Sequence, residues 1–203
     1  VADMCRKIEE NSISLPLYQR DISWTLQKCI DLLNYQLWGK APVSPISINV
    51  INTVDSAVPQ VSFIDREIIS TIERGQYSVV DGQQRLTTNY KAYCNHDDFR
   101  NIVLDLGKGE FTEVRDSIRS NQIPVGILLN KEDTKLFEYT KAKSALGSAD
   151  VLSVLLQVRS KMRNYNYTLN SAEDLTEDEQ IEWFEVCLLY TSRAHETSAH
   201  LVC

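Results

Sequence analysis

A short apolar segment in the first half of the chain leads directly into polar residues that could bind an anion. Residues 77–80 are apolar and β-branched, which predicts a buried strand, and Asp81-Gly82 is a dipeptide typical of turns. A helix is expected to begin at Gln83. Its first turn leaves backbone N–H groups without partners at the positive end of the helix dipole, so a phosphate is favoured where Arg85 can pair with it. A solvated helix start without a ligand is the alternative, and the pattern alone leaves both interpretations open.

A second uncommon string lies upstream, at residues 15–24, where a proline is followed by Tyr-Gln-Arg and then by tryptophan. Residues 80–88 read Val-Asp-Gly-Gln-Gln-Arg-Leu-Thr-Thr. The two strings, in this order and roughly sixty residues apart, resemble the motifs of the DUF-262 family, the N-terminal domain of GmrSD-type modification-dependent restriction systems. The resemblance implies a ParB/sulfiredoxin-like fold, and it links the chain to nucleotide binding and hydrolysis and to the sensing of modified DNA.

The resemblance assigns a nucleotide site to the residues that follow the predicted central strand. Gly82 would let the backbone approach a phosphate, and Arg85 would pair with that phosphate as a planar donor. Gln83 or Gln84 would orient a water or recognise the ligand, whereas Asp81 would either hold a divalent ion or orient Arg85. The sequence leaves these alternatives open. The catalytic candidates are therefore Asp81, Gln83, Gln84 and Arg85.

The Tyr-Gln-Arg string is expected to complete the same pocket from the other side. Arg20 would be a second phosphate-binding cation. The alternative is a loop anchored by a buried tyrosine and a surface arginine, and Trp24 is expected to pack in the core. The candidates for nucleotide or phosphate binding are therefore Gly82, Arg85, Tyr18, Gln19 and Arg20.

Three functions are compatible with this combination of residues. The leading hypothesis is an N-terminal regulatory domain of a phage-defence restriction protein. It would bind and hydrolyse a nucleoside triphosphate (NTP), with Mg²⁺ assisting, and so control DNA cleavage by a separate nuclease domain or subunit. An alternative is a ParB-like module that senses modified DNA without NTP turnover. Direct phosphodiester cleavage is less favoured, because no cluster of carboxylates or histidines stands out and no Ser/His/Asp triad can be assembled around His96.

Composition sets the broad class of protein. The chain has 203 residues, 43% hydrophobic and 24% charged, which is typical of a globular protein with a sizeable core. No apolar run approaches the roughly 20 residues of a transmembrane helix and no signal sequence opens the chain, so we expect a cytoplasmic protein. The formal net charge of −7 argues against a domain that grips DNA through bulk electrostatics, although it leaves room for a local basic pocket.

The C-terminal residues 187–203 are expected not to be native. Cys-Leu-Leu-Tyr-Thr-Ser is the translation of a common sequencing adapter, so the native sequence is expected to stop near Val186. The predicted organisation is a nucleotide-site domain over residues 1–125, its helical continuation over 126–186, and the adapter over 187–203. Outside the adapter the remaining histidine and cysteines form no metal-binding pattern, which predicts free thiols and no metal site; these residues are His96, Cys5, Cys29 and Cys94.

An α+β fold, with a small mixed sheet packed with several helices, must position the candidate residues. Strands are expected at 13–17, 46–51, 77–80, 102–106, 110–114 and 123–129. Gly107-Lys108-Gly109 is expected to be a hairpin turn rather than a P-loop. Helices are expected at 2–10, 23–38 with Ser23 as N-cap, 83–94, 131–143, 149–165 and from Thr176, where Glu179 completes a capping box. The apolar spacing of residues 61–74 is compatible with a further helix, although their β-branched content weakens that prediction. Arg159, Lys161 and Arg163 are expected to complement the C-terminal end of their helix.

Overall fold

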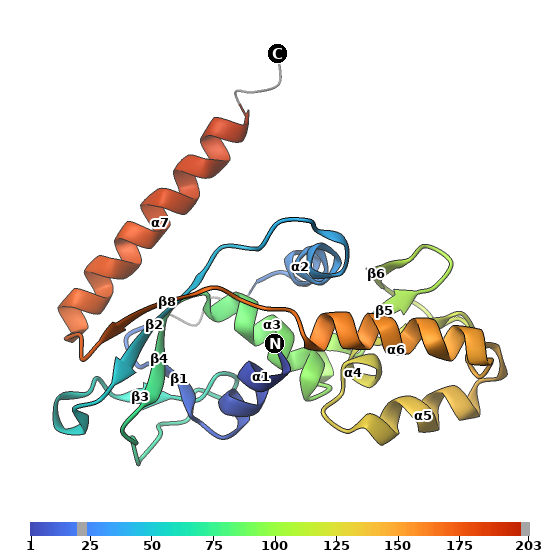
Figure 1. Cartoon of the computed structure of the whole chain (residues 1–203), viewed down its shortest axis with the longest axis horizontal. Helices are drawn as coiled ribbons and strands as arrows, with labels where there is room; N and C mark the ends of the chain where they lie inside the picture. Colours follow the sequence, from blue (N-terminus) through green and yellow to red (C-terminus); the bar gives the residue numbers. More distant parts are fainter. Residues whose placement is uncertain (20–23, 200–203) are drawn as a thin grey trace. The chain divides into compact units, whose positions relative to one another are not determined.

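The computed structural model describes residues 1–19 and 24–199 (Figure 1), and its contacts divide the chain into two compact units. Unit 1 is formed by three stretches, Val1–Arg6, Asp21–Val43 and Gln84–Tyr167. Unit 2 is formed by Lys7–Arg20, Ser44–Gln83 and Thr168–Cys203. Each unit is therefore built from segments that are distant in the sequence. The domain limits inferred from the family resemblance, 1–125 and 126–186, stay a prediction.

Unit 2 is organised around β4 (Gln76–Asp81), the central strand of a five-stranded sheet in the order β3-β1-β4-β2-β8 (Figure 1). β1 (Ile13–Pro16) pairs with one edge of β4 in parallel, and β2 (Ile46–Ile51) pairs with the other edge antiparallel. β3 (Gln60–Val61) lies antiparallel to β1, and β8 (Leu169–Glu173) lies parallel to β2. The parallel pairing of β1 with β4 places the carboxyl ends of both strands at the same edge of the sheet.

The residues of β4 explain its central position. Val79 and Val80 are consecutive and therefore point to opposite faces of the sheet, and both side chains are fully buried. A strand that is covered on both faces needs apolar residues on both faces, and these two adjacent valines provide them. Three buried polar side chains of the sheet are paired with one another: the Ser14 hydroxyl donates to Gln60 Oε1 and accepts from Gln76 Nε2, each at 2.8 Å.

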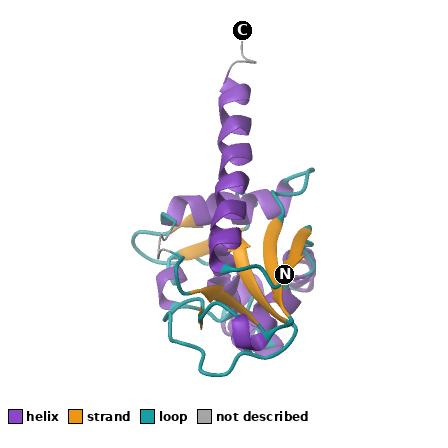
Figure 2. Ribbon diagram, turned by 90° about the vertical axis from the view of Figure 1, so that its left-hand side faces the viewer, coloured by secondary structure: helices purple, strands orange, loops and turns teal. Residues whose placement is uncertain are grey.

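The last helix of unit 2, α7 (Glu177–Ala199), follows β8 and is one continuous helix in Figure 2. A capping box begins it, as predicted. The Glu179 carboxylate accepts a hydrogen bond from the Thr176 backbone N–H at 2.9 Å, and the Thr176 hydroxyl accepts one from the Glu179 N–H at 3.4 Å. Two backbone donors at the helix start are thereby satisfied. The first 3₁₀ helix of the chain, η1 (Val54–Ser56), lies between β2 and β3.

Unit 1 packs helices around a three-stranded antiparallel sheet in the order β6-β5-β7. Its core contains fully buried side chains from five different elements, Leu33, Leu104, Ile123, Leu136 and Leu155. The strands are β5 (Ile102–Asp105), β6 (Glu110–Glu113) and β7 (Gln122–Pro124). The helices are α2 (Leu26–Trp38), α3 (Gln83–Tyr93), η2 (Asp97–Phe99), α4 (Val125–Leu128), α5 (Asp133–Ala142), η3 (Ser144–Leu146) and α6 (Ala149–Arg163), and α1 (Ala2–Glu9) begins in this unit.

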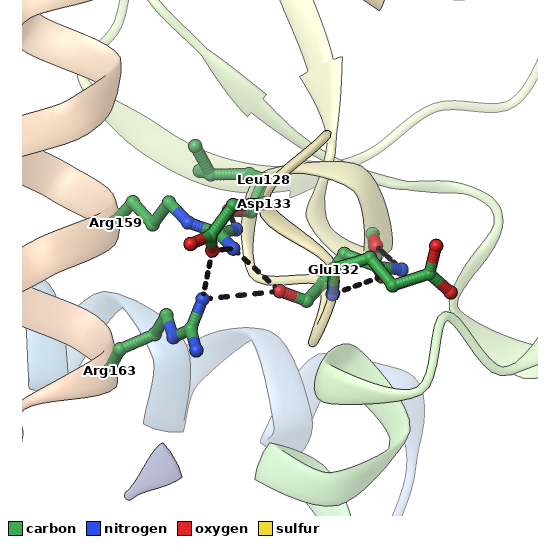
Figure 3. A network of polar contacts seen from close by, with 7 residues as sticks. Leu128, Glu132, Asp133, Arg159 and Arg163 are labelled. Atoms are coloured by element: carbon green, nitrogen blue, oxygen red, sulfur yellow. Dashed lines mark hydrogen bonds and ion pairs between the residues drawn. The ribbon is translucent and has the colours of Figure 1, made fainter. Parts of the chain in front are cut away.

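A polar network holds α6 against the connection between α4 and α5 (Figure 3). The Arg159 guanidinium donates to the backbone oxygens of Leu128 and Asn130 and to the Asp133 carboxylate, the last at 2.5 Å. Arg163 donates to the same carboxylate at 2.7 Å. The Arg159 side chain is only 7% exposed. The expectation that Arg159 complements the end of its helix is therefore wrong, because this side chain turns into the core and satisfies carbonyl groups of another helix.

Most of the predicted elements are confirmed. The helices and the two small sheets give an α+β class, whereas the ParB/sulfiredoxin-like comparison stays a prediction. The hairpin of β5 and β6 is confirmed, and Gly109 takes the positive φ of 71° that its turn requires. Among the described residues, Cys5, Cys29 and Cys94 are thiols and not half of a disulfide, as predicted. None of the described helices is both long and apolar enough to cross a membrane.

Three local predictions are wrong. Residues 61–74 form no helix, because Val61 pairs with Leu15 in the sheet and Arg66 has a left-handed φ of 53°. The strand predicted at 123–129 ends at Pro124, which has no N–H for the sheet, and α4 begins directly afterwards. Ser23 lies outside the described residues. The N-cap of α2 is Thr25, whose hydroxyl accepts from the Lys28 N–H at 3.4 Å.

Candidate functional site

The Asp-Gly-Gln-Gln-Arg motif forms the turn that connects β4 to α3. Asp81 is the last residue of β4, and Gly82 is buried with a φ of +100°. A residue with a side chain is strained at this φ, so the reversal requires glycine. α3 begins at Gln83 without an acidic residue in its first turn, so no carboxylate of the helix offsets the positive end of its dipole. The strand, turn and helix predicted here are confirmed.

Gln19 attaches the Tyr-Gln-Arg string to the end of β4. Its side-chain Nε2 donates to the carbonyl oxygens of Val79 at 2.9 Å and Val80 at 2.7 Å. Because β1 runs parallel to β4, the residues that follow β1 reach the edge of the sheet at which Asp81 lies. Parts of both motifs are thereby brought together within unit 2.

The structure gives Tyr18 and Gln19 roles that the sequence did not indicate. The amide nitrogen of Gln19 is used by the β4 carbonyls, and its Oε1 is buried without a hydrogen-bond partner. The Tyr18 hydroxyl donates to Gln180 Oε1 of α7 at 3.3 Å. Burial, followed by the charge of Glu177, raises the pKa of Tyr18 to about 12. Tyr18 therefore contacts the start of α7 through its hydroxyl, and its place in the nucleotide pocket stays a prediction. Arg20 lies outside the described residues.

The two glutamines of the motif differ in their surroundings. The Trp24 backbone N–H donates to Gln84 Oε1 at 3.1 Å, so the Gln84 side chain holds the chain just before α2. In the described part of the chain, the half-buried Gln83 side chain makes no hydrogen bond. Of the two amides, Gln83 is thus the one whose donor and acceptor remain available to a ligand.

Arg85 shares a face of α3 with Asn89, which belongs to a buried network of polar side chains in unit 1. The Tyr167 hydroxyl donates to Asn89 Oδ1 at 2.9 Å and accepts from Gln36 Nε2 at 2.8 Å. Gln36 and Asn89 also exchange two amide hydrogen bonds of 3.0 Å each. Asn89 follows Arg85 by four residues and so shares its face of α3. Burial raises the pKa of Tyr167, and the positive charge of Arg85 acts in the opposite direction.

A metal ion at the turn would need oxygen atoms from a bound phosphate compound in addition to those of the protein. Among the described residues, no three His, Cys, Asp or Glu side chains are arranged to hold a metal ion. Mg²⁺ is usually held by substrate phosphates and waters together with one or two carboxylates. Asp81 is the carboxylate of this turn and fits that requirement.

Comparison with known families then identifies the chain. A family model described as "GmrSD restriction endonuclease, N-terminal domain" matches residues 1–194. The chain belongs to this family. No curated protein and no solved structure matches it. The family inferred from the two motifs is confirmed, and the chain is accordingly a module of a restriction system.

Sequence reasoning missed four residues that surround the motifs of this GmrSD N-terminal domain. Arg66 donates to the backbone oxygen of Gln19 at 2.7 Å, yet it lies in a segment predicted to be helical. Nothing in the sequence indicates its left-handed backbone conformation. Asn89 could have been noticed as a polar residue four positions after Arg85, whereas its two partners come from distant segments. The missed residues are Arg66, Gln36, Asn89 and Tyr167.

Proposed function

We propose that this domain binds and hydrolyses an NTP at the turn between β4 and α3 and thereby regulates DNA cleavage by a nuclease domain or subunit. The observation that carries the proposal is the contact of Gln19 with Val79 and Val80, which holds the first family motif against the strand end that leads into the second. Membership of the GmrSD family supports the part of the proposal that links the domain to a restriction system. The helix start supplies backbone donors for a phosphate.

Each residue of the turn has a different role in the proposed site. Gly82, which has no side chain, lets a phosphate approach the backbone N–H groups at the start of α3. Arg85 pairs with a phosphate oxygen through its planar guanidinium. Gln83 orients the attacking water, because its amide has no hydrogen bond among the described residues. Gln84 instead positions the motif through Trp24.

Asp81 is the residue proposed to share a Mg²⁺ ion with the phosphates of the bound NTP. When bound, the ion neutralises phosphate charge and orients the leaving group. One carboxylate together with phosphate oxygens and waters is sufficient for this metal. The backbone position of Asp81, at the end of β4 and directly before Gly82, supports this assignment.

The test is nucleotide binding and phosphate release by the full-length protein, with each NTP and Mg²⁺. Arg85→Ala is expected to weaken NTP binding roughly ten- to a hundredfold, because it removes hydrogen bonds between charged groups. Gln83→Ala is expected to lower turnover with little change in binding. The matched control is Arg100→Ala, since Arg100 pairs only with Asp97 on the surface. Wild-type protein that neither binds nor turns over an NTP would exclude the proposal.

Contact with DNA through unit 1 is a second candidate function. In unit 1 basic residues outnumber acidic ones, whereas in unit 2 acidic residues predominate by a wide margin. Trp38 is 63% exposed, and its indole nitrogen is held by the Gly109 carbonyl at 2.6 Å. Lys161 lies 5.5 Å from the centre of that ring. An exposed aromatic ring beside a cation suits stacking and phosphate contacts. If Trp38→Ala leaves DNA binding unchanged, the surface around Trp38 is excluded as the DNA-binding site.

A further inference from the structure

Arg66 is attached to the backbone of the Tyr-Gln-Arg string from a separate segment of unit 2. It lies in the irregular connection between β3 and β4, where its φ is 53°. Its Nη2 donates to the backbone oxygens of Gln19 at 2.7 Å and Leu17 at 3.3 Å. A left-handed backbone is uncommon for a residue with a long side chain, so the surrounding contacts must hold it there.

One end of the Arg66 guanidinium has no partner. Nη1 is buried from solvent and makes no hydrogen bond. Within the described residues, Arg66 also forms no ion pair with a carboxylate. An arginine presents five N–H donors and always carries its charge, and a buried donor without an acceptor is costly. A buried donor on an unpaired cation marks a place where an anion is stabilised.

A short series of hydrogen bonds relates Arg66 to the turn after β4. Arg66 donates to the Gln19 backbone, and the Gln19 side chain donates to Val79 and Val80. These two residues directly precede Asp81 and Gly82. Every residue of this series belongs to unit 2, so the relation does not depend on unit 1. Gln19 Oε1 is also buried without a partner, but as a neutral acceptor it is not a counter-ion for Arg66.

We infer that Arg66 is a further ligand-binding residue, which donates from Nη1 to a phosphate oxygen of the bound nucleotide while Nη2 holds the Leu17–Gln19 backbone. This inference rests on the proposed NTP site. It adds to that site a cation from outside both family motifs. A residue that only positioned Gln19 would need the Nη2 contacts but no acceptor at Nη1.

The experiment measures dissociation constants of the full-length protein for an NTP, for inorganic tripolyphosphate and for the matching nucleoside. Arg66→Gln is expected to weaken binding of the NTP and of tripolyphosphate roughly tenfold or more, because a charge-assisted hydrogen bond is lost. Binding of the nucleoside should stay within about twofold. Arg74→Gln is the matched control, since Arg74 is an exposed arginine of the same connection.

Two results would overturn the inference. The first is unchanged tripolyphosphate binding by Arg66→Gln. The second is an equal loss for nucleoside and tripolyphosphate, which would show that Arg66 acts only by positioning the Gln19 loop. Arg85→Ala separates this inference from the proposed function: if Arg85→Ala loses NTP binding and Arg66→Gln does not, only the role of Arg66 fails. If neither variant affects NTP binding, the site itself fails.

A measurement on wild-type protein keeps the test valid if Arg66→Gln does not fold. The side-chain Nε–Hε resonance of Arg66 can be followed by NMR in isotope-labelled protein during titration with tripolyphosphate. A saturable shift of the Arg66 resonance, absent for Arg74, is expected. An Arg66 resonance that does not move at saturating tripolyphosphate would contradict the contact.

Discussion

Replacing Arg159 with methionine should destabilise unit 1 because this side chain satisfies carbonyl groups of a separate helix. Its guanidinium donates to the backbone oxygens of the buried residues Leu128 and Asn130 and to the Asp133 carboxylate. Methionine fills a similar volume but donates no hydrogen bond, so the Leu128 carbonyl loses this donor and the Asn130 carbonyl keeps the longer 3.4 Å contact with Arg163 (Figure 3).

The size of the effect follows from the three acceptors. Each buried carbonyl left without its charged donor costs about 1–2 kcal/mol. The Asp133 side chain is 72% exposed and regains water, so its share is only about 0.5 kcal/mol. Methionine carries no charge, so the variant avoids the cost of burying the guanidinium when the chain folds, which returns about 1 kcal/mol. The net loss in the free energy of unfolding is expected to be about 2–3 kcal/mol.

Urea denaturation followed by tryptophan fluorescence and far-UV circular dichroism measures this loss. With a slope of about 2 kcal/mol per molar urea, the midpoint should fall by roughly 1 M. The control is Arg163→Met, which removes a 2.7 Å contact with the exposed Asp133 and a 3.4 Å contact with Asn130, and should cost about 1 kcal/mol or less. A loss below about 0.5 kcal/mol for Arg159→Met, or equal losses for both variants, would refute the reasoning.

Three further outcomes are expected. Gly82→Ala should lower the free energy of unfolding by about 1–3 kcal/mol in thermal or urea melts, because its φ of +100° strains any side chain, whereas Gly147→Ala, at a φ of −87°, should cost less. Tyr167→Phe should cost about 1–2 kcal/mol, since Gln36 and Asn89 lose the hydroxyl that both contact, and an unchanged melting temperature would contradict this. The hydrogen bond from Arg159 is the largest cause that lowers the pKa of Asp133. Because a depressed pKa stabilises the fold above the unfolded value near 3.9 and the effect is lost as pH falls through the folded value, the stability difference between wild type and Asp133→Asn should shrink from pH 5 to pH 3. A difference that is constant over that range would show that the Asp133 charge is not coupled to folding.

The elements that the sequence predicted correctly are those whose signal is local. Val79 and Val80 are adjacent β-branched residues, Gly82 follows an aspartate in a turn dipeptide, and Thr176 with Glu179 forms a capping box; each depends on neighbours within a few residues. Local rules of propensity, turn chemistry and capping decide such segments.

The residues that were misjudged depend on distant partners. Arg159 has the spacing of a cation at the end of a helix, and only the position of Leu128, some thirty residues earlier, reveals that it is buried. Residues 61–74 are rich in isoleucine at helical spacing, yet Val61 is paired with Leu15 and Ile68 is 72% exposed. Tertiary pairing overrides propensity in both cases.

The order of the strands explains why parts of two motifs so far apart in the sequence lie at the same edge of the sheet in unit 2. Ile13 and Ser14 pair in parallel with Tyr77 and Ser78, so the carboxyl ends of both strands lie at the same edge of the sheet. A parallel pair cannot be joined by a tight turn, and the long connection between β1 and β4 is a geometric necessity. That connection includes β3, which runs back along β1, and then Arg66, which reaches the backbone of Gln19. The intervening segment is thus more than a linker, because it supplies the cation that holds the backbone of the first motif, whose Gln19 side chain contacts the end of β4.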